Sequence, residues 1–250
     1  MPLTDLQIAL GAMVTAKAAG SRAAVSNFDD LSLTAAERDW LARLPDTQGF
    51  NVTCHIQRWW RETKLNWTAR LTLAALGTEL ADAALKDYLE ATPCPSLFFT
   101  PEALGFLDFV ASRANPPHVA EIARFERALL VAKEAAQQSA GRRSGDDELP
   151  SGARLEPHTA AALVEFTAPP VEILGALFER RDLPPASSTR FPAIIATGLP
   201  HLWRPATADE ASLFTCCRSA PSVGDLLASA PNSAPLLRRL LSAGALRSIV

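Results

Sequence analysis

The side chains that could bind a metal ion or act as nucleophiles are few and scattered along the chain. The histidines are His55, His118, His158 and His201. None of them stands with another histidine, a cysteine or a carboxylate in a known metal-binding motif. Cys54 directly precedes His55, but adjacent side chains on a helix point about 100° apart. The sequence therefore predicts no metal site in this chain.

The cysteines give no stronger signal for chemistry. They are Cys54, Cys94, Cys216 and Cys217. The last two are neighbours, so they lack the two-residue gap of a thiol redox motif or a zinc knuckle. We expect all four to be small buried hydrophobes. No nucleophile elbow, phosphate-binding glycine loop or dinucleotide fingerprint occurs either. We thus predict no catalytic residue and no cofactor, with a stand-alone enzyme of unrecognised site kept as an alternative.

The most unusual local feature is the run Arg58, Trp59, Trp60 and Arg61. Two adjacent tryptophans on a helix cannot both face one core, whereas the arginines, three residues apart, share a side. Either one tryptophan is buried and the other is half-covered by arginine stems, or the run is a partner surface, because Trp and Arg dominate interface hot spots. Both interpretations stay open. The pair Phe98–Phe99 is expected in the core.

A second candidate site lies in the apolar run 191–198, which Pro and Gly bound, as is typical of a strand. An edge strand with unpaired amides can accept an extended peptide as an additional strand. The candidate peptide-binding residues of the strand are Ala193, Ile194, Ile195, Ala196 and Thr197. A helix expected over 235–243 would add a groove wall made of Leu237, Arg238 and Leu241. The alternative is a small winged helix buried against its own N-terminal domain.

The apolar periodicity predicts the elements that carry these residues. In the first half it indicates helices only, over about 1–25, 35–44, 51–77, 80–89, 101–110 and 118–138. In the second half it indicates strands and short helices, in the order strand 159–166, helix 169–179, strands 191–198 and 199–205, helices 207–217, 222–228 and 235–243, and a possible strand 245–250. The fold class is therefore mainly α with a small α+β part, and the C-terminal layout is winged-helix-like.

Composition indicates how the chain is organised. A length of 250 residues favours one large or two modest domains, and 48% hydrophobic against 20% charged residues allows a packed core. The stretch 139–152 is rich in Gly, Ser and mixed charge, which is typical of a flexible linker. We predict a helical partner-binding domain over 1–140, a linker over 141–152 and a winged-helix-like peptide-binding domain over 153–250.

Charge and hydropathy limit the partners. The net charge of −3 argues against bulk attraction to nucleic acid. Residues 151–250 carry nine basic and eight acidic side chains, which weakens DNA binding by the third helix of a winged helix. No signal peptide begins the sequence, and no run approaches the roughly 20 apolar residues of a membrane span. We expect a cytoplasmic protein without nucleic-acid or membrane partners.

Two stretches resemble known families. TADEASLFTCCRSAPSVGDLLASAP followed by LLRRLLSAGALRSI, after a strand pair, resembles the RiPP recognition element, the PqqD-like winged helix that captures leader peptides of ribosomally made natural products. YLEATPCPSLFFTPEALGFLDFVA followed by PPHVAEIARFERALLVA resembles the TglI- and HvfC-like partner proteins of multinuclear non-haem iron oxidative enzymes. Together the stretches cover about half the chain, and their order in one chain is stronger evidence than either alone.

This resemblance implies a function. The chain would be the non-catalytic subunit of a heterodimer whose iron enzyme acts on a cysteine of a carrier or precursor peptide, as in 3-thiaglutamate biosynthesis. Iron would belong to the partner enzyme, and this subunit would hold the peptide. One departure concerns the helix expected over 169–179, which separates strands that the usual recognition element runs consecutively. A winged-helix transcriptional regulator is the alternative.

Overall fold

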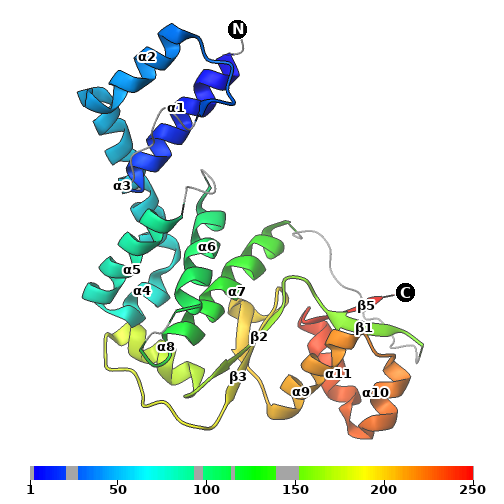
Figure 1. The fold of residues 1–250 in the computed structure, drawn as a ribbon. Coiled ribbons are helices and arrows are strands. Elements are labelled where there is room, and N and C mark those ends of the chain that lie inside the picture. The colour runs from blue at the N-terminus through cyan, green and yellow to red at the C-terminus, as the bar shows by residue number, and fades with distance from the viewer. Residues whose placement is uncertain (1–2, 21–27, 93–97, 114–115, 139–151, 250) are drawn as a thin grey trace. The chain divides into compact units, whose positions relative to one another are not determined.

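A computed structural model describes residues 3–20, 28–92, 98–113, 116–138 and 152–249 (Figure 1). The protein is mainly helical with a small sheet part, which confirms the predicted fold class at that level. It divides into two compact units, Met1–Phe109 and Val110–Val250. Within the described residues, no helix is both long enough and apolar enough to cross a bilayer.

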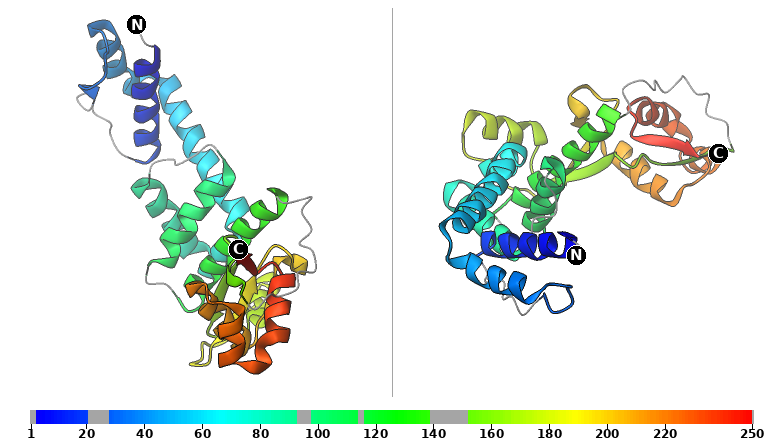
Figure 2. Two further views of the ribbon diagram at one scale, coloured as in Figure 1. Left: turned by 90° about the vertical axis from the view of Figure 1, so that its right-hand side faces the viewer. Right: turned by 90° about the horizontal axis from the view of Figure 1, so that it is seen from above.

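The N-terminal unit is built from helices alone. They are α1 (Leu3–Ala18), α2 (Ala35–Arg43), α3 (Gln48–Thr68), α4 (Arg70–Leu76), α5 (Thr78–Ala91) and most of α6 (Phe99–Ala111). Helix α1 runs alongside the first part of α3 (Figures 1 and 2). The predicted helix 51–77 is interrupted once, at Ala69, whose φ of −111° and ψ of 38° are not helical. Gly77 then ends α4 with a φ of 72°, which an L-residue rarely adopts.

The helix starts in this unit follow their local sequence. Thr34 caps α2, because its hydroxyl accepts a hydrogen bond from the Glu37 amide at 3.3 Å and the Glu37 carboxylate accepts from the Thr34 amide at 2.7 Å. This reciprocal pair is the capping box. Helices α1 and α2 and the start of α3 enclose a small core that contains Met13, Leu41 and Phe50.

The C-terminal unit combines strands and helices. Its elements are α7 (Val119–Gln138), β1 (Arg154–Pro157), β2 (Ala162–Phe166), α8 (Pro170–Glu179), β3 (Phe191–Ile195), β4 (Trp203–Pro205), α9 (Ala208–Cys216), α10 (Val223–Ser229), α11 (Ala234–Ser242) and β5 (Leu246–Ile249). The described strands form a three-stranded antiparallel sheet in the order β2-β3-β4 and a two-stranded antiparallel sheet of β1 and β5. Every helix expected after residue 153 is present. The strand expected over 199–205 is a strand only at Trp203–Pro205, because Pro200–Leu202 form a 3-10 helix. β1 is an addition that the sequence did not predict.

Helix α7 packs on the three-stranded sheet. The ring centroid of Phe125 lies 5.6 Å from that of Phe166 and 5.2 Å from that of Trp203, both edge to face. The compact division therefore places α7 with the strands, whereas the sequence grouped residues 1–140 into one domain. The expected linker, 141–152, lies almost wholly outside the described residues, which omit 139–151.

The connection between β2 and β3 contains α8, yet the two strands pair directly. Phe166, the last residue of β2, faces Phe191, the first residue of β3. Segment 167–190 thus leaves and re-enters the sheet at the same end (Figure 1). The Ser187 amide closes this long loop by donating to the Thr167 carbonyl at 2.7 Å. The pairing of 159–166, which the inserted helix had put in doubt, is present over residues 162–166.

Helices α9, α10 and α11 lie together beside β1 and β5 (Figures 1 and 2). They share one apolar core with β1, β3 and β5, whose largest members are Ile194, Phe214, Leu226, Leu237 and Leu246. The strands β2 to β4 and the three helices therefore form one packed body.

Candidate functional site

The structure corrects the position of the predicted peptide-binding strand. β3 is the central strand of its sheet, because it pairs with β2 on one side and β4 on the other. Its candidate residues Ala193, Ile194, Ile195 and Ala196 are all fully buried, and Thr197 is half-buried. The expectation that this strand is an open edge is wrong. Its amides are used within the sheet, so they cannot receive a peptide.

The open edge belongs to β2. In the register of the sheet, Glu165 faces Pro192, which has no amide hydrogen to donate. Antiparallel pairs alternate between hydrogen-bonded and non-hydrogen-bonded, so Glu165 and, two residues earlier, Leu163 are the non-hydrogen-bonded positions. The Ala206 amide donates to the Pro192 carbonyl at 2.9 Å, which confirms that the backbone carbonyl of Pro192 points toward the β4 side of the sheet and away from β2. The N–H and C=O groups of Leu163 and Glu165 therefore point away from β3.

Nothing among the described residues pairs with this edge of β2 between residues 163 and 165. The edge is closed just beyond, at Thr167, whose amide donates to Glu121 Oε2 at 3.1 Å and whose carbonyl accepts from Ser187. Glu165 is exposed, and Leu163 is half-buried against the core shared with α11. The edge thus offers two donors and two acceptors, with one apolar and one acidic side chain.

The other outer strand, β4, offers less. It has three residues, and Pro205 lacks an amide donor. Arg204 is paired with β3, and its side chain donates to the Pro205 carbonyl at 2.9 Å. Trp203 is therefore the one residue of β4 whose N–H and C=O groups both point away from the sheet. β2 is therefore the better template for an added strand.

The predicted groove wall on α11 is placed only in part as expected. Leu237 is fully buried in the core, so it cannot contact a peptide. Arg238 is exposed and Leu241 is half-buried against the same core that Leu163 of β2 borders. Arg239, next to them, lies 3.6 Å from the buried Glu210. Of the three residues predicted on α11, Arg238 and Leu241 are therefore accessible, whereas Leu237 is not.

The tryptophans of α3 are exposed. The exposed fraction is 56% for Trp59, 40% for Trp60 and 71% for Trp67. The first interpretation, one buried and one half-covered tryptophan, is therefore wrong for this pair. Phe98, expected in the core, is 76% exposed. Phe99 joins the group, with ring centroids 5.6 Å from Trp60 and 6.4 Å from Trp67.

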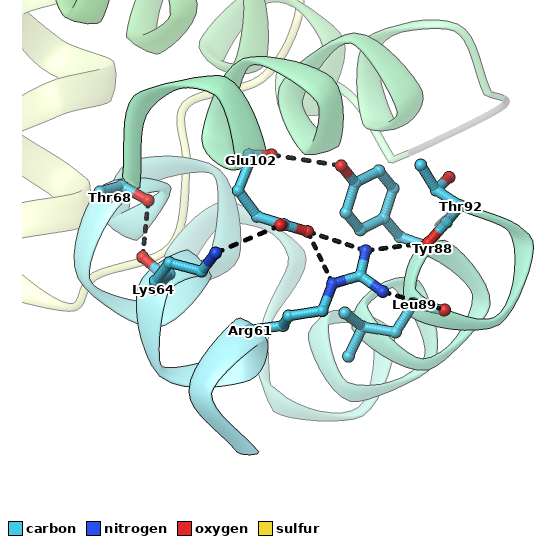
Figure 3. Close-up of polar contacts among 7 residues, drawn as sticks. All are labelled: Arg61, Lys64, Thr68, Tyr88, Leu89, Thr92 and Glu102. Carbon is cyan, nitrogen blue, oxygen red and sulfur yellow. Dashed lines mark hydrogen bonds and ion pairs between the residues drawn. The ribbon is translucent and has the colours of Figure 1, made fainter. Parts of the chain in front are cut away.

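Arg61 is not part of that surface, which corrects its predicted role. It is 1% exposed and points into the N-terminal unit (Figure 3). Its Nε and Nη2 donate to the same Glu102 oxygen at 3.0 and 2.8 Å, and Nη2 also donates to the Thr92 carbonyl at 2.9 Å. Lys64 Nζ reaches the second Glu102 oxygen at 3.4 Å. These contacts tie α3 to α5 and α6.

Arg58 differs from Arg61 although both were assigned to one side of the helix. Arg58 Nε pairs with Glu62 Oε1 at 3.1 Å, and both side chains are about one-third exposed. The i,i+4 spacing makes this a local pair on the helix surface, with a small effect on stability. Of the predicted interface, Arg58, Trp59 and Trp60 are therefore accessible.

Among the described residues, the cysteines and histidines form no cluster that resembles a catalytic site. Cys54 and Cys217 are buried as expected, Cys216 is exposed against expectation, and Cys94 lies outside the described residues. Burial, and next the neighbouring Cys216, raise the pKa of the Cys217 thiol to about 11. Across the described residues, no three histidine, cysteine or acidic side chains gather where they could hold a metal ion.

His118 is buried in a structural contact. Its Nε2 lies 2.8 Å from the Pro184 carbonyl, and its Nδ1 lies 3.1 Å from the Thr167 hydroxyl and 3.2 Å from Glu121. The ring thereby joins the start of α7 to the end of β2 and to the loop after α8. Its role here is to hold three segments together.

A second buried carboxylate stabilises the start of α9. Glu210 is fully buried, and its oxygens accept from Arg204 at 2.7 and 2.8 Å and from the Thr207 amide at 3.0 Å. The hydrogen bonds from Arg204 are the main cause that holds the pKa of Glu210 below its ordinary value, against the effect of burial. Thr207 and Glu210 form a capping box at the start of the helix.

The sequence reasoning missed Leu163 and Glu165, although one signal could have found them. Because proline cannot donate to a neighbouring strand, Pro192 fixes which residues of β3 point toward which neighbour. The buried pairing of Arg61 with Glu102 had no comparable signal, because the two residues are 41 positions apart.

Comparison with protein-family models, and separately with curated proteins, found no match to this chain.

Proposed function

We propose that this chain is a peptide-binding accessory subunit that holds a carrier or precursor peptide for a partner enzyme. The observation that carries the proposal is the open edge of β2, where Leu163 and Glu165 direct unpaired backbone groups outward beside an exposed acidic side chain. An extended peptide pairs with such an edge through its own backbone, and alternate side chains give selectivity.

The order of elements in the C-terminal unit supports this proposal. Strands β2 to β4 followed by the helices α9 to α11 have the order of a winged helix of the PqqD-like recognition-element type. Their shared apolar core supports treating them as one binding module. The helix α8 is then an insertion in the β2–β3 connection, which leaves the pairing of the two strands intact.

The energetics of an added strand suit a weak to moderate peptide interaction. Leu163 and Glu165 can each donate one hydrogen bond and accept one. A backbone hydrogen bond contributes about 0.5–1.5 kcal/mol net, so the edge alone supplies a few kcal/mol. Contacts between the side chain of Leu163 and the side chains of the peptide would add to this free energy.

The partner in this proposal is an iron-dependent oxidative enzyme that acts on a cysteine of the bound peptide. The resemblance of the N-terminal stretches to partner proteins of such enzymes supports it. Iron would be held by the enzyme, and this chain would supply binding and presentation. Bringing a tethered peptide to an active site raises its effective concentration without new chemistry in the subunit.

The test takes its peptide from any short open reading frame found next to this gene. The peptide is synthesised with a fluorescent label, and its binding to the full chain is followed by fluorescence anisotropy. Glu165→Pro removes one outward amide, and proline is tolerated at an edge where that amide has no partner. We expect about tenfold weaker peptide binding for Glu165→Pro, because the added strand loses one hydrogen bond and meets the proline ring in its place. Glu165→Ala, which keeps the amide, is the matched control, and its dissociation constant for the peptide should stay within about threefold of the wild-type value.

Two outcomes would contradict the proposal. One is equal affinity of the wild type and the Glu165→Pro variant while circular dichroism shows both folded. The other is no peptide binding together with binding of a duplex DNA that weakens steeply with added salt, which is the signature of phosphate contacts. That second result would favour the winged-helix regulator instead.

A further inference from the structure

The exposed face of α3 carries a second feature that the peptide site does not use. Six residues share this face, and they are Val52, Ile56, Trp59, Trp60, Thr63 and Trp67. At about 100° per residue they fall within an arc of roughly 100°, opposite the buried face that holds Cys54, Arg61 and Leu65. We call these six residues the α3 stripe.

The spacing of the α3 stripe is symmetric. Its successive intervals are four, three, one, three and four residues, so it reads the same in both directions about a midpoint between Trp59 and Trp60. A two-fold axis through that midpoint would place the stripe of one helix against the same stripe of an antiparallel copy. Such an isologous contact uses one self-complementary patch twice.

The stripe contains no charged side chain. The charged residues of α3 lie on its other faces, with Arg61 and Lys64 buried and Arg58 paired with Glu62. Close to a two-fold axis, a charged residue would meet its own like charge. The α3 stripe avoids this repulsion because its central residues are tryptophans.

The apolar area is large for a surface without an occupant. Val52, Ile56 and the three tryptophans are each 40% exposed or more. Side chains of this size then expose on the order of 100 Å² each, or roughly 500 Å² together, which reaches the upper range for patches on monomers. Two such stripes in contact would bury about 1,000 Å², the lower bound for a specific interface.

We propose that a second copy of this chain covers the α3 stripe, so that the protein is a homodimer in which two α3 helices pack antiparallel. Trp59 and Trp60 lie at the centre, against the same residues of the second copy. Val52 of each copy lies opposite Trp67 of the other, and Ile56 lies opposite Thr63. The contact has the geometry of side-by-side helices with interlocking side chains.

This inference does not rest on the peptide-binding proposal. The stripe lies in the N-terminal unit, whereas the β2 edge lies in the C-terminal unit, so a dimer would present two peptide sites. It replaces the expectation that Arg58, Trp59, Trp60 and Arg61 meet the iron enzyme, which would then bind another surface.

The first test is the mass of the full chain by light scattering after size exclusion, at concentrations up to about 100 µM. We expect about twice the monomer mass of 26.8 kDa. Trp59→Glu places like charges near the axis and should give the monomer mass with unchanged helix content. Phe178→Glu, on α8 and 77% exposed, is the matched control and should remain dimeric.

The second test fixes the register by disulfide formation. Trp59→Cys places two thiols near the axis, so oxidation should link most of the chains. Val52→Cys is the control with the same native cysteines, because its two copies would lie about 22 Å apart along the helices. A monomer at every concentration, a dimer that Trp59→Glu leaves intact, or equal crosslinking of the two cysteine variants would overturn the proposal. None of these results bears on peptide binding.

Discussion

At the residue scale, the N-terminal unit depends on a buried carboxylate shared by two cations. Glu102 is fully buried, and so are its partners Arg61 and Lys64. A buried charge left without its partner costs several kcal/mol, whereas an exposed pair contributes little. The position of Glu102 therefore decides whether α3 can keep its cations inside while its tryptophans face outward.

We expect Glu102→Ala to lower the free energy of unfolding by about 3–5 kcal/mol, because it leaves two buried cations without this carboxylate. Glu62→Ala removes the partner of Arg58 at the surface and should cost less than about 1 kcal/mol. Urea unfolding of both variants, followed by circular dichroism, measures the difference. Similar costs for the two variants would show that the buried contacts do not stabilise the unit.

Glu210 makes the stability of the C-terminal unit depend on pH. The pKa of Glu210 is lowered in the folded protein, so the folded state favours the ionised carboxylate. This stabilises the fold at pH values above the pKa of an ordinary glutamate. The stabilisation is lost as the pH falls through the lowered pKa of the folded state. Glu210→Gln should therefore destabilise the protein at pH 7. The difference in the free energy of unfolding between Glu210→Gln and the wild type should become smaller as the pH falls below about 4.3. A gap that is the same at pH 7 and at the lowest pH measured would contradict the assigned role of the Arg204 contact.

The sequence could not reveal these residue roles. Two arginines three positions apart predict a shared side of the helix, and only tertiary contacts decide that Arg61 turns inward to Glu102 while Arg58 stays at the surface. The exposure of Trp59 and Trp60 follows from the same rotation of α3. By contrast, the capping residues Thr34 and Thr207 were predictable, because capping depends on neighbours within one turn.

At the element scale, most strands and helices followed from local patterns, but the strand order did not. The sequence predicted a strand before β3 and a hairpin after it, and these two neighbours together make β3 central. Helix α8 obscured this, since strands joined through a helix are usually parallel neighbours, whereas β2 and β3 pair antiparallel. The Ser187–Thr167 hydrogen bond explains the exception, because it brings segment 167–190 back to the end of β2.

Two glycines test the packing of these elements. A Cβ at Gly198, after β3, would lie 2.9 Å from the backbone of Ala243 at the end of α11, whereas a Cβ at Gly175 in α8 would meet nothing within 4 Å. Gly198→Ala should destabilise the protein by about 1–3 kcal/mol through this clash. Gly175→Ala should stabilise it by up to about 1 kcal/mol, because alanine favours a helix. Thermal unfolding of both variants checks whether each substitution raises or lowers the stability. A Gly198→Ala variant as stable as the wild type would contradict the close approach of α11 to the sheet.

At the scale of the whole molecule, contacts divide the chain into two compact units between Phe109 and Val110, a boundary that the sequence did not indicate. The apolar face of α7 could have packed on either unit, and its periodicity contains no information about which. Phe125 packs against Phe166 and Trp203, which joins α7 to the sheet. The linker composition at 139–152 indicated the end of a helix, which need not be the end of a compact unit.

The two proposals give the molecule two surfaces for two kinds of occupant. The β2 edge offers backbone hydrogen bonds with an acidic rim, which suits an extended peptide. The α3 stripe offers aromatic side chains without charge, which suits a second protein surface. Because they lie in separate compact units, a substitution on one surface should leave the occupancy of the other unchanged.

The most direct measurement of the central claim is hydrogen exchange at individual amides, with and without the peptide used in the anisotropy test. In the peptide-free protein, we expect the amides of Leu163 and Glu165 to exchange fast, while the Val164 amide, which is paired with β3, exchanges slowly. Saturating peptide should slow exchange at Leu163 and Glu165 by at least tenfold. Peptide binding that leaves both amides as fast as before, or that protects only residues outside β2, would contradict the account.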